Sequence, residues 1–363
     1  MAPSRQLLAA AVAAAVLLSG CGGGGPSAGP SSPTTPSSPT TAVTTAAPTG
    51  LDATAWLAGL RVGRPPAIGY VIGHRYHAPD GHIVRVLPDH GTTSIARLGD
   101  DFLATSDQYF EGTTAIYRLD RSGRVLASGT VSSPPVLSAD GRTLHWLTFT
   151  PPETGLERPT RLHRADVTTG GTSWVALHVA PAFLTSVVGV VDGTAVLTTG
   201  WGGRTDTWLA PASGAPRRVR SLDGATAVAP SARLVALRTG KDHNALEVVD
   251  LASRDPLWHA EGTYPVAFSP SGRRLLAFEG RRLVVLDART GDLSRVLPRP
   301  SYRRGAWLSE QLAWEDERHL LAGVDLPHRT AVVRIDVATG ELSTAIDWTP
   351  SEGTYGVAFE TSR

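Results

Sequence analysis

Two stretches of the chain carry residue types at spacings that could support catalysis or metal binding. Residues 25–29 read Gly-Pro-Ser-Ala-Gly and match the GxSxG pattern, in which a nucleophilic serine sits between a strand and a helix. The surrounding residues are almost all Gly, Pro, Ser, Thr or Ala, so neither element can form and we interpret the match as chance. Four histidines are close enough in sequence to be considered as metal ligands: His74, His77, His82 and His90. On a strand His74 and His77 would point to opposite faces, so we predict no metal site, and nothing in the sequence indicates a cofactor.

Cys21 is the only cysteine of the chain, and it follows a short apolar run. One early basic residue, Arg5, precedes an Ala/Val/Leu stretch that is too short to span a bilayer, which is typical of an export signal. Leu18, Ser19 and Gly20 lead into Cys21, and this motif resembles the lipobox of bacterial lipoproteins. The resemblance implies that residues 1–20 are a signal peptide, that Cys21 is lipidated, and that lipid holds the protein on the extracytoplasmic face of the cell membrane.

Three segments follow the signal peptide. Residues 21–50 are predicted to be a disordered tether, because their Gly, Pro, Ser and Thr content offers no apolar periodicity. Residues 51–65 contain Trp56 and a proline stop, and we predict a short helix or strap there. Residues 66–363 are predicted to form one domain. Because the chain has no second cysteine, no internal disulfide can form and this domain must rest on its hydrophobic core.

The predicted domain is all β. Its Val, Leu, Ala, Thr and Trp runs are broken by Gly, Asp and Pro and lack helical periodicity. One unit recurs, and its clearest copy predicts two strands with a tight turn over 265–278, then two more over 282–293. In the later turn Asp287 can fold back on its own backbone while Gly291 supplies a positive φ. Successive copies lie about 40 residues apart, which is the period of four-stranded propeller blades.

The string Phe-Ser-Pro-Ser-Gly-x-x-Leu-x-x-Phe at 268–278 resembles the WD-repeat-like blades of TolB-type β-propellers, which have Asp where this chain has Ser271. The resemblance implies a β-propeller and carries no catalytic residue. Full repeats begin near residues 91, 133, 182, 223, 263 and 304. Strands at 68–72, 82–87 and 355–359 would complete one more, so that the two ends of the domain pair and close the ring. We therefore predict a monomeric propeller of about seven blades, with six or eight as alternatives.

The charge is nearly balanced, with 34 basic and 33 acidic residues, which argues against a nucleic-acid partner. One basic cluster belongs to a single blade and the loop after it: Arg273, Arg274, Arg281, Arg282, Arg299, Arg303 and Arg304. Contact with an anionic envelope polymer or with lipid headgroups is one hypothesis for this cluster, and ordinary solvated hairpin charges are the alternative. Four tryptophans in or beside strands are predicted to pack in the core: Trp146, Trp174, Trp208 and Trp258.

In a propeller the second-to-third-strand turns gather with the blade-to-blade connections on one rim, and in this chain these loops are the longer and more polar ones. We predict contact residues there: Tyr109, Trp201, Arg204, His243, Tyr302 and His328. The favoured function is a membrane-anchored lipoprotein that binds a protein or envelope polymer partner outside the cell, as a scaffold, sensor or adaptor.

The alternative function is a propeller hydrolase or lyase acting on envelope sugars or lactones. Such an enzyme would need carboxylates or histidines that converge at the channel mouth with shifted pKa values. Residues 138–146 resemble the Asp box of sialidases, but Gly141 follows Asp140 directly where the Asp box has one residue between them. We therefore predict only a hairpin turn there.

Overall fold

The structure is a computed structural model of the 363-residue chain. It describes residues 49–51, 53–87, 90–110, 113–131, 133–149, 160–177, 184–201, 204–240, 243–298, 301–302, 307–326, 328–351 and 356–361. All described residues lie in one compact unit, which begins near residue 42. The predicted signal peptide, Cys21 and most of the predicted tether therefore lie outside the described residues. In the part that is described, no helix is both long and apolar enough to cross a membrane.

The described strands form antiparallel sheets that are built mostly from consecutive strands. Three sheets consist of four consecutive strands each. They are β14 (Leu184–Val191), β15 (Thr194–Trp201), β16 (Arg204–Ala210) and β17 (Arg217–Arg218); β18 (Ala225–Ala229), β19 (Leu234–Thr239), β20 (Ala245–Asp250) and β21 (Pro256–Glu261); and β22 (Thr263–Phe268), β23 (Arg274–Glu279), β24 (Arg282–Asp287) and β25 (Leu293–Leu297). A further sheet has the same order, with β2 (Arg61–Val62) added beside the last of β27 (Trp307–Trp314), β28 (His319–Leu326), β29 (Arg329–Asp336) and β30 (Leu342–Pro350).

An eight-stranded sheet contains two such meanders. They are β6 (Thr92–Leu98), β7 (Asp101–Phe110), β8 (Thr113–Leu119) and β9 (Val125–Val131), then β10 (Val136–Leu137), β11 (Thr143–Phe149), β12 (Thr160–Asp166) and β13 (Thr172–Leu177). The two meanders are joined where Val131 pairs with Thr148. A short parallel pair, β1 (Thr49–Leu51) with β26 (Ser301–Tyr302), and a 3₁₀ turn η1 (Arg220–Leu222) complete these elements.

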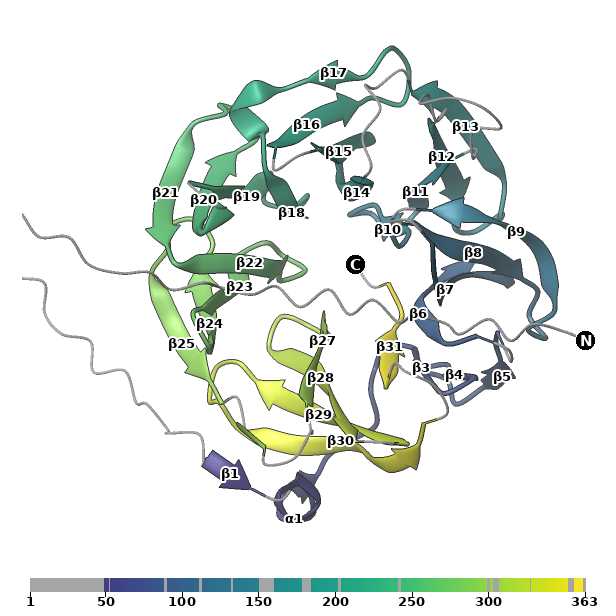
Figure 1. Ribbon diagram of the computed structural model, residues 1–363, viewed down its shortest axis with the longest axis vertical. Helices are drawn as coiled ribbons and strands as arrows, with labels where there is room; N and C mark the ends of the chain where they lie inside the picture. Colours follow the sequence, from purple (N-terminus) through teal and green to yellow (C-terminus); the bar gives the residue numbers. More distant parts are fainter. Residues whose placement is uncertain are drawn as a thin grey trace, which may run out of the picture. The chain divides into compact units, whose positions relative to one another are not determined.

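The remaining sheet joins the two ends of the domain. β31 (Val357–Phe359) pairs with β3 (Tyr70–Ile72), which pairs with β4 (Arg75–His77) and then β5 (Ile83–Arg85). These are the strands that the sequence predicts for a closing blade. Figure 1 shows the sheets of this unit arranged around a ring, with the first strand of each nearest the centre. The predicted all-β propeller arrangement is therefore confirmed.

The two ends of each sheet form two rims. The turns that join first to second and third to fourth strands lie at one end, which we call the turn rim, and the second-to-third-strand turns and the connections between sheets lie at the other, the loop rim. Turns of the turn rim are closed by aspartate as predicted. The carboxylate of Asp287 accepts the N–H groups of Arg289 (2.9 Å) and Thr290 (3.0 Å), and Gly291 has a φ of +77°.

The hydrophobic core lies between neighbouring sheets. Phe268, Leu275 and Val284 of one sheet pack against Leu234 and Val248 of the preceding one. Because each sheet supplies one face to each neighbour, side chains on both faces of the inner strands are apolar, as in the fully buried run of Leu275–Ala277. The four predicted core tryptophans differ in burial. Trp146 is buried, and Trp208 and Trp258 pack partly buried against core clusters, as predicted.

Trp174 is a correction to that prediction, because it is 52% exposed. It lies on β13, the outermost strand of its meander, so only one side of it has a neighbouring strand. The guanidinium of Arg161 lies 4.3 Å from its ring centroid and covers one ring face.

The segment 51–65 forms both elements that the sequence allows. Helix α1 (Ala53–Ala58) places Leu57, which is 2% exposed, in the core cluster of the β27–β30 sheet. β2 then pairs in parallel with β30, and the Gly63 N–H donates to the Thr344 carbonyl at 2.8 Å. The segment is therefore a strap across the outer edge of this sheet.

Candidate functional site

The first strands of the sheets surround a central cavity of about 530 Å³. Residues of β6, β10, β14, β18, β22, β27 and β31 line it. Its polar side chains are engaged within the protein: the Thr226 hydroxyl donates to the Ala236 carbonyl (3.2 Å), and the Ser138 hydroxyl donates to Asp140 (2.6 Å). Thr93 likewise bonds to Thr105 at 2.8 Å. The cavity wall thus offers small polar and apolar surfaces whose hydroxyls serve the fold.

The mouth of this cavity on the turn rim is acidic. An adjoining cavity of about 520 Å³ shares Leu137, Trp314 and Glu360 with the central one. Its lining adds three consecutive carboxylates from the β27–β28 turn, Glu315, Asp316 and Glu317, and the guanidinium of Arg97. This is the one place among the described residues where carboxylates converge on the channel, so it is the position at which the enzyme hypothesis can be examined.

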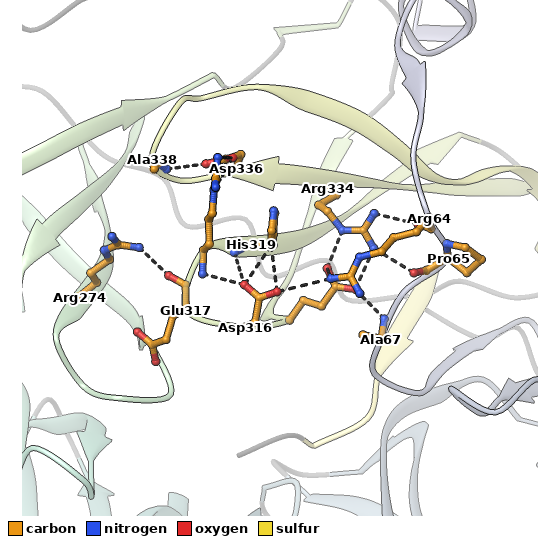
Figure 2. A network of polar contacts seen from close by, with 12 residues as sticks. Arg64, Pro65, Ala67, Arg274, Asp316, Glu317, His319, Arg334, Asp336 and Ala338 are labelled. Carbon is orange, nitrogen blue, oxygen red and sulfur yellow. Dashed lines mark hydrogen bonds and ion pairs between the residues drawn. The ribbon is translucent and has the colours of Figure 1, made fainter.

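Glu315 is held by a buried ion pair. Its side chain has no exposed surface, and that of Arg334, on β29, is 6% exposed. Arg334 donates from Nε to Glu315 Oε2 (2.6 Å) and from Nη2 to Oε1 (2.8 Å), and it also donates to the carbonyl oxygens of Arg64 (2.8 Å) and Pro65 (3.0 Å). The Ala67 N–H donates to Glu315 Oε1 at 2.6 Å. Figure 2 shows Arg334 directed at the strap residues Arg64 and Pro65. We call this group of five residues the strap brace.

The strap brace keeps Glu315 ionised. Burial alone would raise the pKa of the Glu315 carboxyl, but the hydrogen bonds from Arg334 and from the Ala67 N–H outweigh burial and lower that pKa. A carboxyl that stays ionised and holds an arginine in a two-pronged contact cannot donate a proton as a general acid. Glu315 therefore has a structural role in this geometry.

The neighbouring charges of the turn are also paired. Asp316 accepts the backbone N–H groups of Arg318 (2.7 Å) and His319 (2.9 Å), and its Oδ2 lies 2.9 Å from the Nδ1 of His319. Burial would raise the pKa of Asp316, but these hydrogen bonds lower it. Arg318 in turn donates from Nε to Asp336 at 2.7 Å. Asp316 therefore holds the turn against the start of β28, and Arg318 links the turn to Asp336 at the β29–β30 turn.

Glu317 reaches the preceding sheet. Its carboxylate accepts the hydroxyls of Ser269 (3.1 Å) and Ser271 (2.7 Å) and the Ser271 N–H, and its carbonyl accepts Arg274 Nη1 at 2.5 Å. A glutamate from the next sheet thus supplies the carboxylate at the Ser271 turn. The contact locks two neighbouring sheets together at the turn rim, as Figure 2 shows for Arg274 and Glu317.

A second buried polar group lies beside the same mouth. Tyr76 is fully buried, and its hydroxyl donates to Glu360 Oε2 at 2.7 Å and accepts from Arg97 Nε at 3.1 Å. Burial and then the charge of Glu360 raise the pKa of Tyr76 far above its usual value, so the phenol stays neutral. Gly69 permits this arrangement, because a Cβ there would overlap the Glu360 carboxylate and the Tyr76 hydroxyl. The group ties β31 to β4 and so holds the closing sheet together.

The turn also contains the one set of three metal-ligating side chains within reach of a common ion in the described part of the chain. The ligand atoms of Glu315, Asp316 and His319 lie within 4.8 Å of one another. Both oxygens of Glu315 already bind Arg334, however, and Arg64 Nη2 lies 3.6 Å from Glu315 and 3.5 Å from Asp316. A divalent cation here would face two guanidinium groups. The donor set therefore does not fit a metal ion.

The predicted contact residues lie on elements of the loop rim. These are Tyr109 (β7), Trp201 and Arg204 (β15 and β16), His243 (β19–β20 turn), Tyr302 (β26) and His328 (β28–β29 turn). Trp201 and Arg204 are directly paired residues at the end of one hairpin. His243 and His328 both have left-handed backbones, with φ of +54° and +63°. The side chains of the other four lie outside the described part of the structure, so a contact role for these six residues stays a prediction.

The predicted basic cluster does not form one patch among the described residues. Arg274 lies at the turn rim and donates to Glu317, whereas Arg282 lies at the loop rim and pairs with Glu279 at 3.0 Å. Arg299, Arg303 and Arg304 lie outside the described residues. The solvated-hairpin interpretation is therefore favoured over a shared polymer-binding surface for Arg274 and Arg282.

Comparison with known proteins adds likeness in fold. No protein-family model matches the sequence, and no curated protein sequence matches it. Solved structures that are similar include a functionally unknown protein from Desulfotomaculum acetoxidans DSM 771 (14% identity, 81% of this chain and 98% of that chain, TM-score 0.48). Also similar is a putative 6-phosphogluconolactonase from Bacteroides uniformis ATCC 8492 (13% identity, 80% of this chain and 99% of that chain, TM-score 0.49). A third is TolB from Acinetobacter baumannii (14% identity, 80% of this chain and 66% of that chain, TM-score 0.41). At these TM-scores and identities the likenesses carry no argument about function, and the propeller assignment rests on the strand order described above.

Proposed function

We propose that this protein is a lipid-anchored, extracytoplasmic β-propeller of seven blades that binds a protein or envelope polymer partner on its loop rim. The blade number is supported by dividing the eight-stranded sheet at the Val131–Thr148 pair, which gives seven meanders in the described residues. It is also supported by the seven first strands that line the central cavity. Residues 66–363 are the propeller, and residues 51–65 are its strap.

The anchor belongs to the same proposal. Residues 1–20 serve as the export signal, Cys21 carries the lipid, and residues 21–50 are the tether. Each methylene of an acyl chain contributes about 0.8 kcal/mol of membrane affinity, so two or more chains on Cys21 would hold the protein stably at the membrane. A tether of this composition would let the propeller reach a partner some tens of ångströms from the anchor, roughly 30 Å as a flexible coil.

One observation carries the choice of binding over catalysis: the carboxylates at the described mouth of the cavity are ion-paired or hydrogen-bonded within the fold. Glu315 binds Arg334, Asp316 contacts His319, and Glu317 holds the neighbouring turn. The pKa values of Glu315 and Asp316 are lowered, whereas a general acid at neutral pH needs a raised value. These groups brace the ring and leave binding to the longer loops of the opposite rim.

The alternative function, a hydrolase or lyase acting on envelope sugars or lactones, has one observation in its favour. The central cavity of about 530 Å³ has the size of a small-molecule site and adjoins the acidic mouth. It would require Glu360 or Asp316 to leave its present partner when substrate binds. A screen of purified protein against such substrates, with Asp316→Asn as the comparison, tests it directly.

Affinity capture tests the binding proposal. The anchored protein is crosslinked in its own membranes, and the native chain is compared with Trp201→Ala/Arg204→Ala/His243→Ala on the loop rim. A matched control, Arg121→Ala/Thr168→Ala, changes exposed residues of the turn rim. A partner recovered with the native and control proteins and lost with the loop-rim variant supports the proposal. Recovery of the same partner with the loop-rim variant, or recovery of no partner, contradicts the proposal and favours the enzyme alternative.

A further inference from the structure

A cavity at the loop rim gathers basic side chains. It has a volume of about 700 Å³ and lies between the closing sheet and the end of β30. His74, Arg75, His77, Arg85 and Thr349 contribute to its lining, and no Asp or Glu is among its described lining residues. We call it the Arg75–Arg85 pocket. In the acidic mouth at the turn rim the charges neutralise one another, whereas here only one sign is present.

The two arginines face each other across a strand pair. Arg75 of β4 and Arg85 of β5 are direct register partners, so both side chains leave the sheet on the same face. Neither side chain forms an ion pair or a hydrogen bond within the described part of the structure, and both residues are exposed. Like charges that are directly opposite destabilise an antiparallel pair. A local cost of this kind without a compensating carboxylate is typical of a position that is kept for binding.

The histidines add polar groups to the same space. The buried Nδ1 of His74 has no hydrogen-bond partner in the described part of the structure, although a buried polar atom is nearly always bonded. His74 lies in the β3–β4 turn and not on a strand, so it and His77 reach one cavity, which corrects the expectation that they would diverge. The ring of His77 is held by stacking on Tyr70, with centroids 4.8 Å apart and planes 3° from parallel.

The pocket lies next to a residue that the sequence singled out. The turn over Gly73 and His74 joins a second to a third strand, so it belongs to the loop rim. The end of β30, which supplies Thr349, is followed by Ser351, whose N–H donates to the carbonyl of His328 at 2.9 Å. The strand end that lines the pocket therefore lies next to the His328 turn, one of the predicted contact positions.

We propose that the Arg75–Arg85 pocket binds an oxyanion, the phosphate or carboxylate group of a ligand that reaches the loop rim. Two guanidinium groups on one face can hold such a group from two sides, and each fork matches the spacing of its oxygens. The His74 Nδ1 gains a partner, and the repulsion between the two arginines is relieved. The inference deepens the proposed function by naming the chemical group that the partner presents. It rests on the proposed function only for the source of the ligand.

Histidine NMR on the full chain in detergent micelles tests the proposal. The imidazole signals of ¹⁵N-histidine-labelled protein are followed while inorganic phosphate, sn-glycerol 3-phosphate or D-glucuronate is added at ionic strength held constant with NaCl. The His77 signals, assigned with His77→Gln, should move saturably, with a dissociation constant in the millimolar range or tighter. The phosphate and glucuronate arms separate a phosphate source from a carboxylate source.

Variants complete the test. Arg75→Gln/Arg85→Gln should weaken binding by at least about tenfold, whereas the exposed turn-rim control Arg121→Gln should bind as the native protein does. Arg85→Glu should form an ion pair with Arg75, so it should melt at a higher temperature than the native protein in anion-free buffer while binding no phosphate. This variant separates loss of binding from loss of folding.

Two results would overturn the inference: no saturable movement of the His77 signals with any of the anions, or the same movement in the Arg75→Gln/Arg85→Gln variant. Neither result changes what the capture experiment with the loop-rim variant Trp201→Ala/Arg204→Ala/His243→Ala would show. A failure of this inference is therefore distinguishable from a failure of the proposed function. Conversely, if an anion binds but no partner is captured, the anion-binding pocket is supported and the partner-binding proposal is rejected.

Discussion

Removing Arg334 should destabilise the protein strongly, and the structure sets the size of the effect. Arg334→Met keeps the length of the side chain but leaves the fully buried Glu315 carboxylate with only the more exposed Arg64 at 3.6 Å, and it removes the donors to the carbonyls of Arg64 and Pro65. Breaking a buried pair by removing one partner costs about 3–5 kcal/mol. Because a domain is typically stable by about 5–15 kcal/mol, the loss would be a large part of the total.

Equilibrium urea unfolding, followed by tryptophan fluorescence, measures this loss, and a double-mutant cycle isolates the pair. Glu315→Gln/Arg334→Met should be less destabilised than the sum of its two single variants, because each single variant leaves an unpaired buried charge and the double variant leaves none. Arg334→Lys keeps the charge but not the two-pronged contact, so it should fall between the native protein and Arg334→Met. The strap should also become more sensitive to trypsin at Arg64 in Arg334→Met. An Arg334→Met variant within about 0.5 kcal/mol of native, or a strictly additive cycle, would refute the role of the strap brace.

Three further predictions concern separate parts of the molecule. Burial, and then the charge of Arg164, lower the pKa of His145 to about 4 from a usual value near 6.5. The free energy of unfolding should therefore fall as the pH drops from 6.5 toward 4, by about 3 kcal/mol in all. In urea unfolding at pH 7, 5.5 and 4, His145→Leu should show a flatter dependence on pH than the native protein. Gly69→Ala should lower stability by about 1–3 kcal/mol in the same assay, because its Cβ would displace Glu360 from Tyr76. The control Gly129→Ala, whose Cβ would meet only Ile116 at 3.7 Å, should be neutral or slightly stabilising. Equal effects of the two substitutions would contradict the assigned packing. Cys21→Ser should abolish incorporation of a labelled fatty acid and release the protein from the membrane fraction; continued labelling would reject Cys21 as the lipidated residue.

The repeating turns could be predicted from the sequence because their chemistry is local. An Asp that caps its own backbone and a Gly with positive φ three or four residues later lie within one turn, so the pattern alone places Asp166, Asp287 and Asp336 at chain reversals. The pairing of the two ends was also predictable, because the strand over 355–359 repeats the pattern of the one over 264–268. What spacing predicted was the order of strands and the position of turns.

The polar clusters could not be predicted in the same way, because their partners are distant in sequence. The sequence pattern of residues 315–320 predicts no more than a turn, yet Glu315 contacts Arg334 nineteen positions later and Ala67 at the other end of the domain. The available signal was the replacement of a Ser-Pro-Ser-Gly turn by four charged residues, which is an unusual density of charge for a tight turn. Trp174 was misplaced because burial of a strand residue depends on whether another strand lies beside it, and β13 is an edge.

The basic lining of the Arg75–Arg85 pocket favours the loop rim as the place of binding. Some arginines of the turn rim pair with carboxylates across neighbouring turns, as in Arg233 with Asp192 (2.6 Å), an exposed contact of the kind that contributes little to stability. On the loop rim the Arg282–Glu279 pair (3.0 Å) shows that the chain can place a carboxylate beside an arginine there too. Arg75 and Arg85 have no such partner among the described residues, although they lie directly opposite each other in register. Two opposed arginines without a carboxylate in one pocket raise the local positive potential, and a bound oxyanion would lower it.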